Sequence, residues 1–199
     1  LNGGVPAAVA PGRRRVGRPP DWGVATVLLP WYLYIYGGDV RVLADYYGYM
    51  VKFCDYFRSL ASGGIVQAGL GDWWDPTPSS GAERIGGGGK PQNTKPALTS
   101  TAYYFFSSKI MSTVAGLLGR EEDAGKYRVW ADEIKSAFNA AFYDPSRSDY
   151  GSQTADALAS FLRIKDGQVG RIGEGQWNPQ VVTVATVQSL WAKFEQPKC

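Results

Sequence analysis

Two pairs of helix-forming segments, each pair joined by only a few residues, constrain the fold of this chain more than any other feature. Residues 24–36 are almost wholly apolar, and residues 40–60 follow with apolar side chains at the i, i+3, i+4, i+7 spacing of an amphipathic helix. The same order, apolar and then amphipathic, returns in residues 99–119 and 121–142. Helices with such short connections pack as antiparallel hairpins. The sequence therefore predicts two αα-hairpins whose tight turns lie at the same end.

Long connections lie at the opposite end of the hairpins. Residues 62–98 are rich in Gly, Pro, Ser and Thr, and connections longer than about 15 residues are often functional. A further helix is predicted over 153–164, whereas the β-branched side chains of 181–194 leave a helix and a strand both open. We expect an all-α protein in two layers, with buried helices inside and amphipathic helices outside. These helices would form about half of a ring of six hairpins.

Local signals indicate how the helices begin and end. Asp21 stands where it could cap the first helix, and Pro30 is expected to kink it. Gly119 is expected to end the third helix. Because the first helix of each pair is the more apolar one, we expect it to be the more buried one.

Composition excludes several classes of function. The chain has no histidine, which excludes a Ser-His triad and a His-ligated zinc site. Its 2 cysteines are too few for a disulfide framework, and Cys54 falls in a helical pattern as a buried thiol. The net charge of +3 includes a short run at Arg13, Arg14, Arg15 and Arg18, which is typical of a solvated loop and too local for a nucleic-acid surface.

Neither a membrane span nor a signal peptide is predicted. No apolar stretch reaches about 18 residues, and the arginines near the start follow the small apolar stretch instead of preceding it. Because the chain begins without Met, missing targeting signals say little about the compartment, and the localisation stays open. No cofactor, metal, nucleic-acid or membrane partner is expected.

Asp-Trp pairs occur twice in loop-like settings. An indole plane can stack on the face of a sugar ring, and a carboxylate can accept hydrogen bonds from neighbouring hydroxyl groups. Both pairs adjoin the long connections, so we expect them at a common opening, binding a neutral polyhydroxylated ligand. The predicted substrate-binding residues are Asp21, Trp22, Asp72, Trp73 and Trp74. Simpler readings remain open: Asp21 as a helix cap, Trp22 as a core side chain, and Asp72 and Asp75 as turn residues.

The sequence also resembles a known enzyme family. The motifs are PDWGVATVLLPWYLYIYGGDVRVLADYYGYMVKFCDYF followed by GDW, then TSTAYYFFSSKI, AGLLGREEDAGKY, IKSAFNAAFYD and SQTADALA. In order and spacing they resemble the catalytic domain of bacterial and fungal α-L-rhamnosidases over residues 3–165. The resemblance implies an (α/α)6 toroid and inverting hydrolysis of terminal α-L-rhamnose from glycosides. It also implies that Trp22 and Trp73 lie against the rhamnose, with Asp21 and Asp72 nearby.

The catalytic residues are unknown from this sequence. In the family resembled here, the acid lies in a D-R-E-type motif upstream of PDWG and the base lies downstream of QTA, and neither motif appears. Glu174 and Glu195 fall in a divergent tail and are not assigned as the base. The division expected is a leading loop (1–20), family-like helical hairpins (21–165) and the tail (166–199).

Three functions therefore stay open at this point. The first is a fragment of a rhamnosidase that lacks both catalytic carboxylates and is inactive alone, acting on a rhamnosylated small molecule or oligosaccharide when complete. The second is a non-catalytic carbohydrate-binding protein, and the third is a helical scaffold without a sugar site. Half a ring would also leave apolar helix flanks uncovered, which predicts either self-association or a poorly packed monomer when the chain is expressed alone.

Overall fold

The computed structural model describes residues 20–71, 93–162 and 164, together with the backbone of three strands between residues 169 and 185. Six helices and two short strands precede those three strands in the described residues. The helices are α1 (Pro20–Gly23), α2 (Ala25–Gly37), α3 (Arg41–Leu60), α4 (Pro96–Leu117), α5 (Glu121–Phe142) and α6 (Gln153–Phe161). The strands are β1 (Ala61–Ser62), β2 (Ile65–Val66), β3 (Val169–Gly173), β4 (Gln176–Asn178) and β5 (Val182–Ala185).

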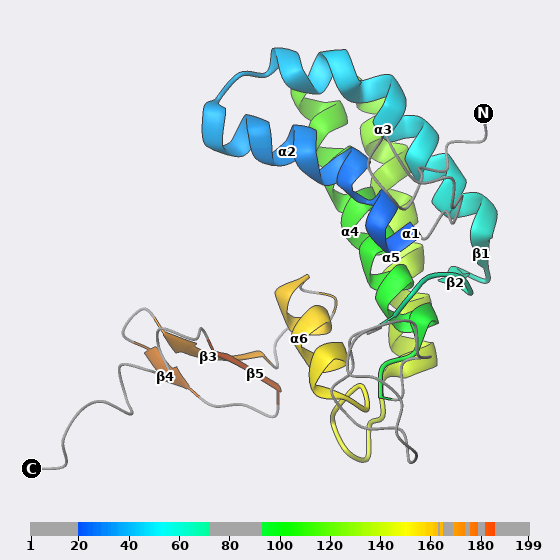
Figure 1. The fold of residues 1–199 in the computed structure, drawn as a ribbon, viewed down its shortest axis with the longest axis vertical. Coiled ribbons are helices and arrows are strands. Elements are labelled where there is room, and N and C mark those ends of the chain that lie inside the picture. Colours follow the sequence, from blue (N-terminus) through cyan, green and yellow to red (C-terminus); the bar gives the residue numbers. More distant parts are fainter. Residues whose placement is uncertain are drawn as a thin grey trace, which may run out of the picture.

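Both predicted hairpins are present, and α4 and α5 run side by side along their length (Figure 1). Helices α2 and α3 are joined by residues 38–40, and α4 and α5 by residues 118–120. Each turn uses a glycine with positive φ, Gly38 at 73° and Gly119 at 69°. Behind Gly119, the Arg120 N–H donates to the carbonyl of Ala115 at 2.8 Å, a bond that satisfies the end of α4. The tight turns and the role of Gly119 are thus confirmed.

Helix α4 is the buried centre of the described structure. Thirteen of its 22 residues are buried, and it packs against α5, α3, α2 and α6. Its aromatic side chains join the core, as where Tyr104 stacks on Phe57 of α3 with ring centroids 5.3 Å apart. Cys54 of α3 lies in the same core as a free, buried thiol, as the sequence predicts.

Helix α2 differs from the expectation of a buried inner helix. Only Val27 and Pro30 of this helix are buried, whereas Leu33 is 60% exposed and Tyr36 is 86% exposed. Its partner α3 buries seven residues, so the first helix is not the more buried one in this pair. The reason is that, among the described residues, α2 packs mainly against α3 and α4. The helix continues through Pro30, which is among its buried residues.

The long connection after α3 begins with structure that the sequence did not predict. Strands β1 and β2 pair antiparallel, with Ala61 opposite Val66, and the turn between them places Gly63 and Gly64 at positive φ. The N–H of Val66 donates to Thr101 Oγ1 of α4 at 3.0 Å, which ties this small hairpin to the buried helix. The connection therefore leaves α3 along the surface of α4.

A three-stranded sheet follows α6 and lies beside it (Figure 1). The strand order is β4-β3-β5, with β3 antiparallel to β4 and parallel to β5. In residues 181–194, where the sequence allowed either a helix or a strand, the structure has a strand at Val182–Ala185. No helix in the described part of the chain is long and apolar enough to cross a membrane.

A polar contact links the outer helices α3 and α5. Tyr47 of α3 donates from its hydroxyl to Asp123 Oδ2 of α5 at 2.7 Å, and Lys126 Nζ lies 3.0 Å from Asp123 Oδ1. The guanidinium of Arg120 lies over the Tyr47 ring, 4.5 Å from its centroid. The Tyr47 hydrogen bond is the main reason that the pKa of Asp123 lies below its ordinary value of 3.8. The contact therefore favours the ionised carboxylate.

Replacing Tyr47 with Phe is expected to lower the free energy of unfolding at pH 7 by about 1 kcal/mol, because one charge-assisted hydrogen bond at a part-buried site is lost. Since the pKa of Asp123 is lowered in the folded state, the stabilisation is complete above the ordinary pKa and fades as the pH falls through the folded value. Denaturant unfolding should therefore show a smaller difference between wild type and Tyr47→Phe at pH 3 than at pH 7. Tyr49→Phe, at an exposed position of the same helix, is the matched control. An equal difference at both pH values would contradict the assignment.

Candidate functional site

The first Asp-Trp pair lies in α1, at the base of the exposed helix α2. Asp21 is buried, with 9% of its surface exposed, whereas Trp22 is 45% exposed. The N–H of Val24 donates to the carbonyl of Pro20 at 3.1 Å, and the backbone turns directly from α1 into α2. The pair thus divides between the interior and the surface, with the carboxylate inside and the indole outside.

The carboxylate of Asp21 binds the start of the long connection. Its Oδ2 accepts hydrogen bonds from the N–H of Leu70 at 2.7 Å and the N–H of Gly71 at 3.1 Å. No side chain caps α2, whose preceding residue is Val24. The interpretation of Asp21 as a helix cap is therefore wrong, because the donors that it satisfies lie about fifty residues away in sequence.

A glycine allows the connection to approach Asp21 so closely. Gly69 has φ of 132°, a conformation that other residues rarely adopt. A Cβ atom at this position would collide with Ser100 Oγ of α4 and lie 3.1 Å from Asp21 Oδ2. The backbone of residues 69–71 is therefore held between α1 and α4.

The second Asp-Trp segment begins at the next residue along the chain. Gly71 directly precedes Asp72, and Trp73, Trp74 and Asp75 follow. These four predicted residues lie outside the described part of the chain, as do Glu174 and Glu195 of the tail. What the structure brings together is the first Asp-Trp pair and the backbone from which the second one leaves.

Several groups that form this site were not predicted from the sequence. They are the backbone N–H groups of Leu70 and Gly71, the glycine at 69 and the buried hydroxyl of Ser100. The only signal was the glycine spacing of AGLGDW, which fits any irregular loop. Ser100 Oγ and Asp21 Oδ1 are both buried without a hydrogen-bond partner among the described residues.

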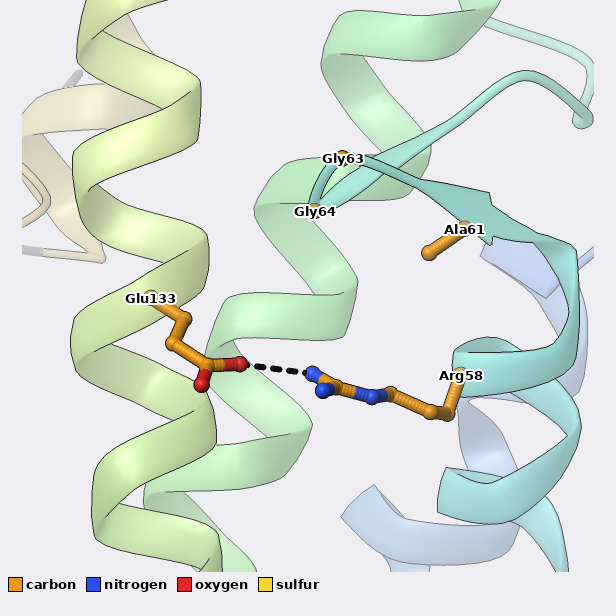
Figure 2. Close-up of a pocket in the computed structure, with 5 residues that line it drawn as sticks. All are labelled: Arg58, Ala61, Gly63, Gly64 and Glu133. Carbon is orange, nitrogen blue, oxygen red and sulfur yellow. Dashed lines mark hydrogen bonds and ion pairs between the residues drawn. The ribbon is translucent and has the colours of Figure 1, made fainter.

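Two cavities lined by described residues lie away from the Asp-Trp pair. One, of about 390 Å³, lies between the β1–β2 turn, the end of α3 and α5 (Figure 2). Arg58 and Glu133 face one another across it with an N–O distance of 2.8 Å, and Arg58 also lies over the Trp130 ring at 4.8 Å. Because the two charges satisfy each other, we interpret this cavity as a cleft beneath the β1–β2 turn and not as a sugar site.

A second cavity, of about 410 Å³, lies between α4 and α5. Its lining residues are Phe105, Lys109, Ser112, Thr113, Arg128, Ala131, Asp132 and Lys135. Two of its hydroxyls already donate to backbone carbonyls, Ser112 to Ala124 and Thr113 to Lys109. Neither cavity includes a residue of the Asp-Trp pair. No group of three or more potential metal-binding side chains occurs in the described residues.

Comparison with protein families identifies one match over most of the chain. The profile described as the bacterial alpha-L-rhamnosidase 6 hairpin glycosidase domain matches residues 1–169. An α-L-rhamnosidase of Formosa agariphila is 32% identical over 182 residues, which is 86% of this chain and 18% of that protein. An α-L-rhamnosidase of Alteromonas sp. is 36% identical over 124 residues, which is 62% of this chain and 13% of that protein.

Solved structures agree with the sequence comparison. The α-L-rhamnosidase from Dictyoglumus thermophilum matches with a TM-score of 0.72 at 32% identity, over 82% of this chain and 18% of that chain. The Streptomyces avermitilis α-L-rhamnosidase complexed with L-rhamnose matches with a TM-score of 0.67 at 25% identity, over 82% of this chain and 14% of that chain. The chain spans less than a fifth of the length of these relatives. Its hairpins are part of a six-hairpin toroid, and the chain belongs to the bacterial α-L-rhamnosidase family, within the six-hairpin glycosidase domain.

Proposed function

We propose that this chain forms part of the rhamnose-binding site of an inverting α-L-rhamnosidase. One observation carries the proposal: the carboxylate of Asp21, next to the exposed Trp22, binds the backbone at Leu70 and Gly71. A chain extends by at most about 3.6 Å per residue, so the Asp72-Trp73 segment must leave from beside the first pair. This supports an opening shared by Trp22 and Trp73.

The substrate class follows from the chemistry of these side chains and from the relatives. Exposed indoles offer flat faces to an apolar sugar face, and Asp72 offers acceptors for sugar hydroxyls. One structural relative is complexed with L-rhamnose, and the curated relatives are named α-L-rhamnosidases. We assign Trp22, Trp73 and Trp74 to the sugar, with Asp72 orienting it.

The acid and base of the reaction are proposed to lie outside this chain. An inverting glycosidase needs two carboxyl groups about 6.5–9.5 Å apart, with room for a water molecule. At the described part of the site, Asp21 is buried and its Oδ2 is occupied by backbone donors. The chain alone would then bind the sugar without hydrolysing it.

The chain alone is expected to release no product from an aryl α-L-rhamnoside, because it lacks the acid and base pair. A chromogenic assay checks this, with a complete α-L-rhamnosidase relative as the positive control. Turnover that rises in proportion to the concentration of the purified chain would contradict the proposal.

Saturable binding of L-rhamnose is expected, followed by tryptophan fluorescence or calorimetry. Trp22→Ala and Trp73→Ala should each weaken it about tenfold, the loss of roughly 1.4 kcal/mol of stacking. Trp130→Phe is the control, since Trp130 lies beside Arg58 and not beside Asp21. Unchanged affinity in both Ala variants would exclude the indoles from the site. Binding by a complete gene product that shows no turnover would favour the carbohydrate-binding protein.

We propose in addition that the isolated chain associates with a second copy of itself through the α2–α3 hairpin. Helix α2 carries no charged residue, and its exposed side chains include Leu29, Leu33 and Ile35. Four tyrosines, Tyr32 and Tyr36 on α2 and Tyr46 and Tyr49 on α3, are also exposed. At about 200 Å² for each tyrosine, they alone expose roughly 500 Å². With the aliphatic side chains, this surface approaches the roughly 800 Å² per partner of a stable interface.

Leu33→Lys combined with Tyr36→Lys should convert a concentration-dependent dimer into a monomer, because each lysine would place a charge in the apolar contact. Sedimentation velocity over a range of protein concentrations measures this. Val129→Lys is the matched control, since Val129 is an exposed apolar residue of α5 outside the hairpin. A monodisperse wild-type monomer at all concentrations would refute the proposal.

A further inference from the structure

We infer that Asp21 is a positioning residue, which fixes the start of the sugar-binding connection and does not itself contact the sugar. The effect of Asp21 on sugar binding rests on the proposed function, whereas its hold on the backbone of Leu70 and Gly71 can be measured without any ligand. It departs from the expectation that Asp21 binds substrate directly, and it assigns the positioning role to one oxygen of the carboxylate, Oδ2.

Both hydrogen bonds of Asp21 end on one oxygen. The N–H groups of Leu70 and Gly71 donate to Oδ2 at 2.7 and 3.1 Å. Two successive N–H groups that converge on one acceptor fix the direction of the backbone more firmly than one bond would. The two residues just before Asp72 are thereby fixed relative to α1.

The other oxygen is closed off. Oδ1 is buried and has no hydrogen-bond partner among the described residues. A sugar hydroxyl could reach it only if the surrounding side chains moved. The exposed member of the pair is Trp22, with 45% of its surface accessible, whereas the carboxylate is buried.

The opposite side of the connection is fixed by packing. Gly69 lies so close to Ser100 that a Cβ atom would collide with the Ser100 hydroxyl. Residues 69–71 are thus confined between the carboxylate of α1 and the buried face of α4. Both supports are helices, which hold their positions better than loops do.

An isosteric substitution of Asp21 distinguishes a positioning role from direct contact with the sugar. In Asp21→Asn, the side-chain carbonyl can take the place of Oδ2 and accept both backbone bonds, while the charge and the second acceptor are lost. In Asp21→Ala, no acceptor remains. A positioning residue is therefore rescued by Asn, whereas a carboxylate that binds the sugar through its charge or through Oδ1 is not.

The experiment measures hydrogen exchange of the Leu70 and Gly71 amides by NMR, and L-rhamnose affinity, in the 199-residue chain. For Asp21→Ala we expect exchange of both amides to rise at least tenfold and rhamnose affinity to fall at least tenfold. For Asp21→Asn we expect exchange and affinity to stay within about threefold of wild type. Asp156→Ala is the matched control, because Asp156 Oδ1 likewise accepts from a loop amide, Tyr150 N–H at 2.8 Å, and should change neither quantity at residues 70–71.

Two results with the Asp21 variants would each overturn the inference. If Asp21→Asn loses rhamnose binding as fully as Asp21→Ala while both amides stay protected, Asp21 contacts the sugar directly. If Asp21→Ala leaves the exchange of Leu70 and Gly71 unchanged, the carboxylate does not hold the connection.

A second variant covers the case in which Asp21→Ala fails to fold. Gly69→Ala displaces the same backbone from Ser100 while leaving Asp21 intact, and it should produce the same rise in exchange and the same loss of affinity. Normal exchange and affinity in Gly69→Ala would overturn the inference. If the wild-type chain binds no rhamnose, the proposed function fails, and the exchange measurements still decide whether Asp21 holds residues 70–71.

Discussion

The buried carboxylate of Asp21 determines how the described parts of this site relate to one another. It joins α1 to a backbone segment about fifty residues further along the chain, through bonds of 2.7 and 3.1 Å to Leu70 and Gly71. Burying a carboxylate is costly unless its charge is met by donors, and here two N–H groups that would otherwise lack partners supply them. The two hydrogen bonds therefore provide partners for the carboxylate oxygen Oδ2 and for both backbone N–H groups. They also place the beginning of the connection next to Trp22.

Helix α4 supports the other side of this connection. Its buried face carries hydroxyl groups as well as apolar side chains, and three of them have separate uses: Thr101 accepts from Val66, Thr99 donates to the carbonyl of Pro96, and Ser100 packs against Gly69. The connection after α3 thus follows α4 from β2 to Gly71 through small polar contacts. A larger side chain at position 100 would occupy the space that the glycine backbone uses, which is why an apolar helix contains TST at this point.

Periodicity predicted the helices well because it depends on neighbours within one helix. The expected segments 40–60 and 121–142 correspond to Arg41–Leu60 and Glu121–Phe142, and only α4 starts earlier than expected, at Pro96, a residue favoured in the first turn. Contacts between distant segments were less predictable. Nothing local distinguishes a helix cap at Asp21 from a carboxylate that binds Leu70, since the deciding donors are remote in sequence. Apolar composition likewise showed that α2 could be buried, but its burial depends on neighbours that the described residues do not supply.

The exposed face of α2 and the indole of Trp22, which we propose binds the sugar, lie close together along the chain. Helices α1 and α2 are separated only by Val24, whose φ and ψ of −54° and −22° are helical. Within α2, Leu29, Leu33 and Tyr36 are exposed and are spaced by four and three residues, which places them on one helical face at about 100° per residue. Trp22 lies in α1, which adjoins the first turn of α2, so a surface that covers the apolar face of α2 along its whole length would approach Trp22. The surface that a neighbouring helix would cover and the indole that would stack on a sugar therefore belong to adjoining helices of the chain.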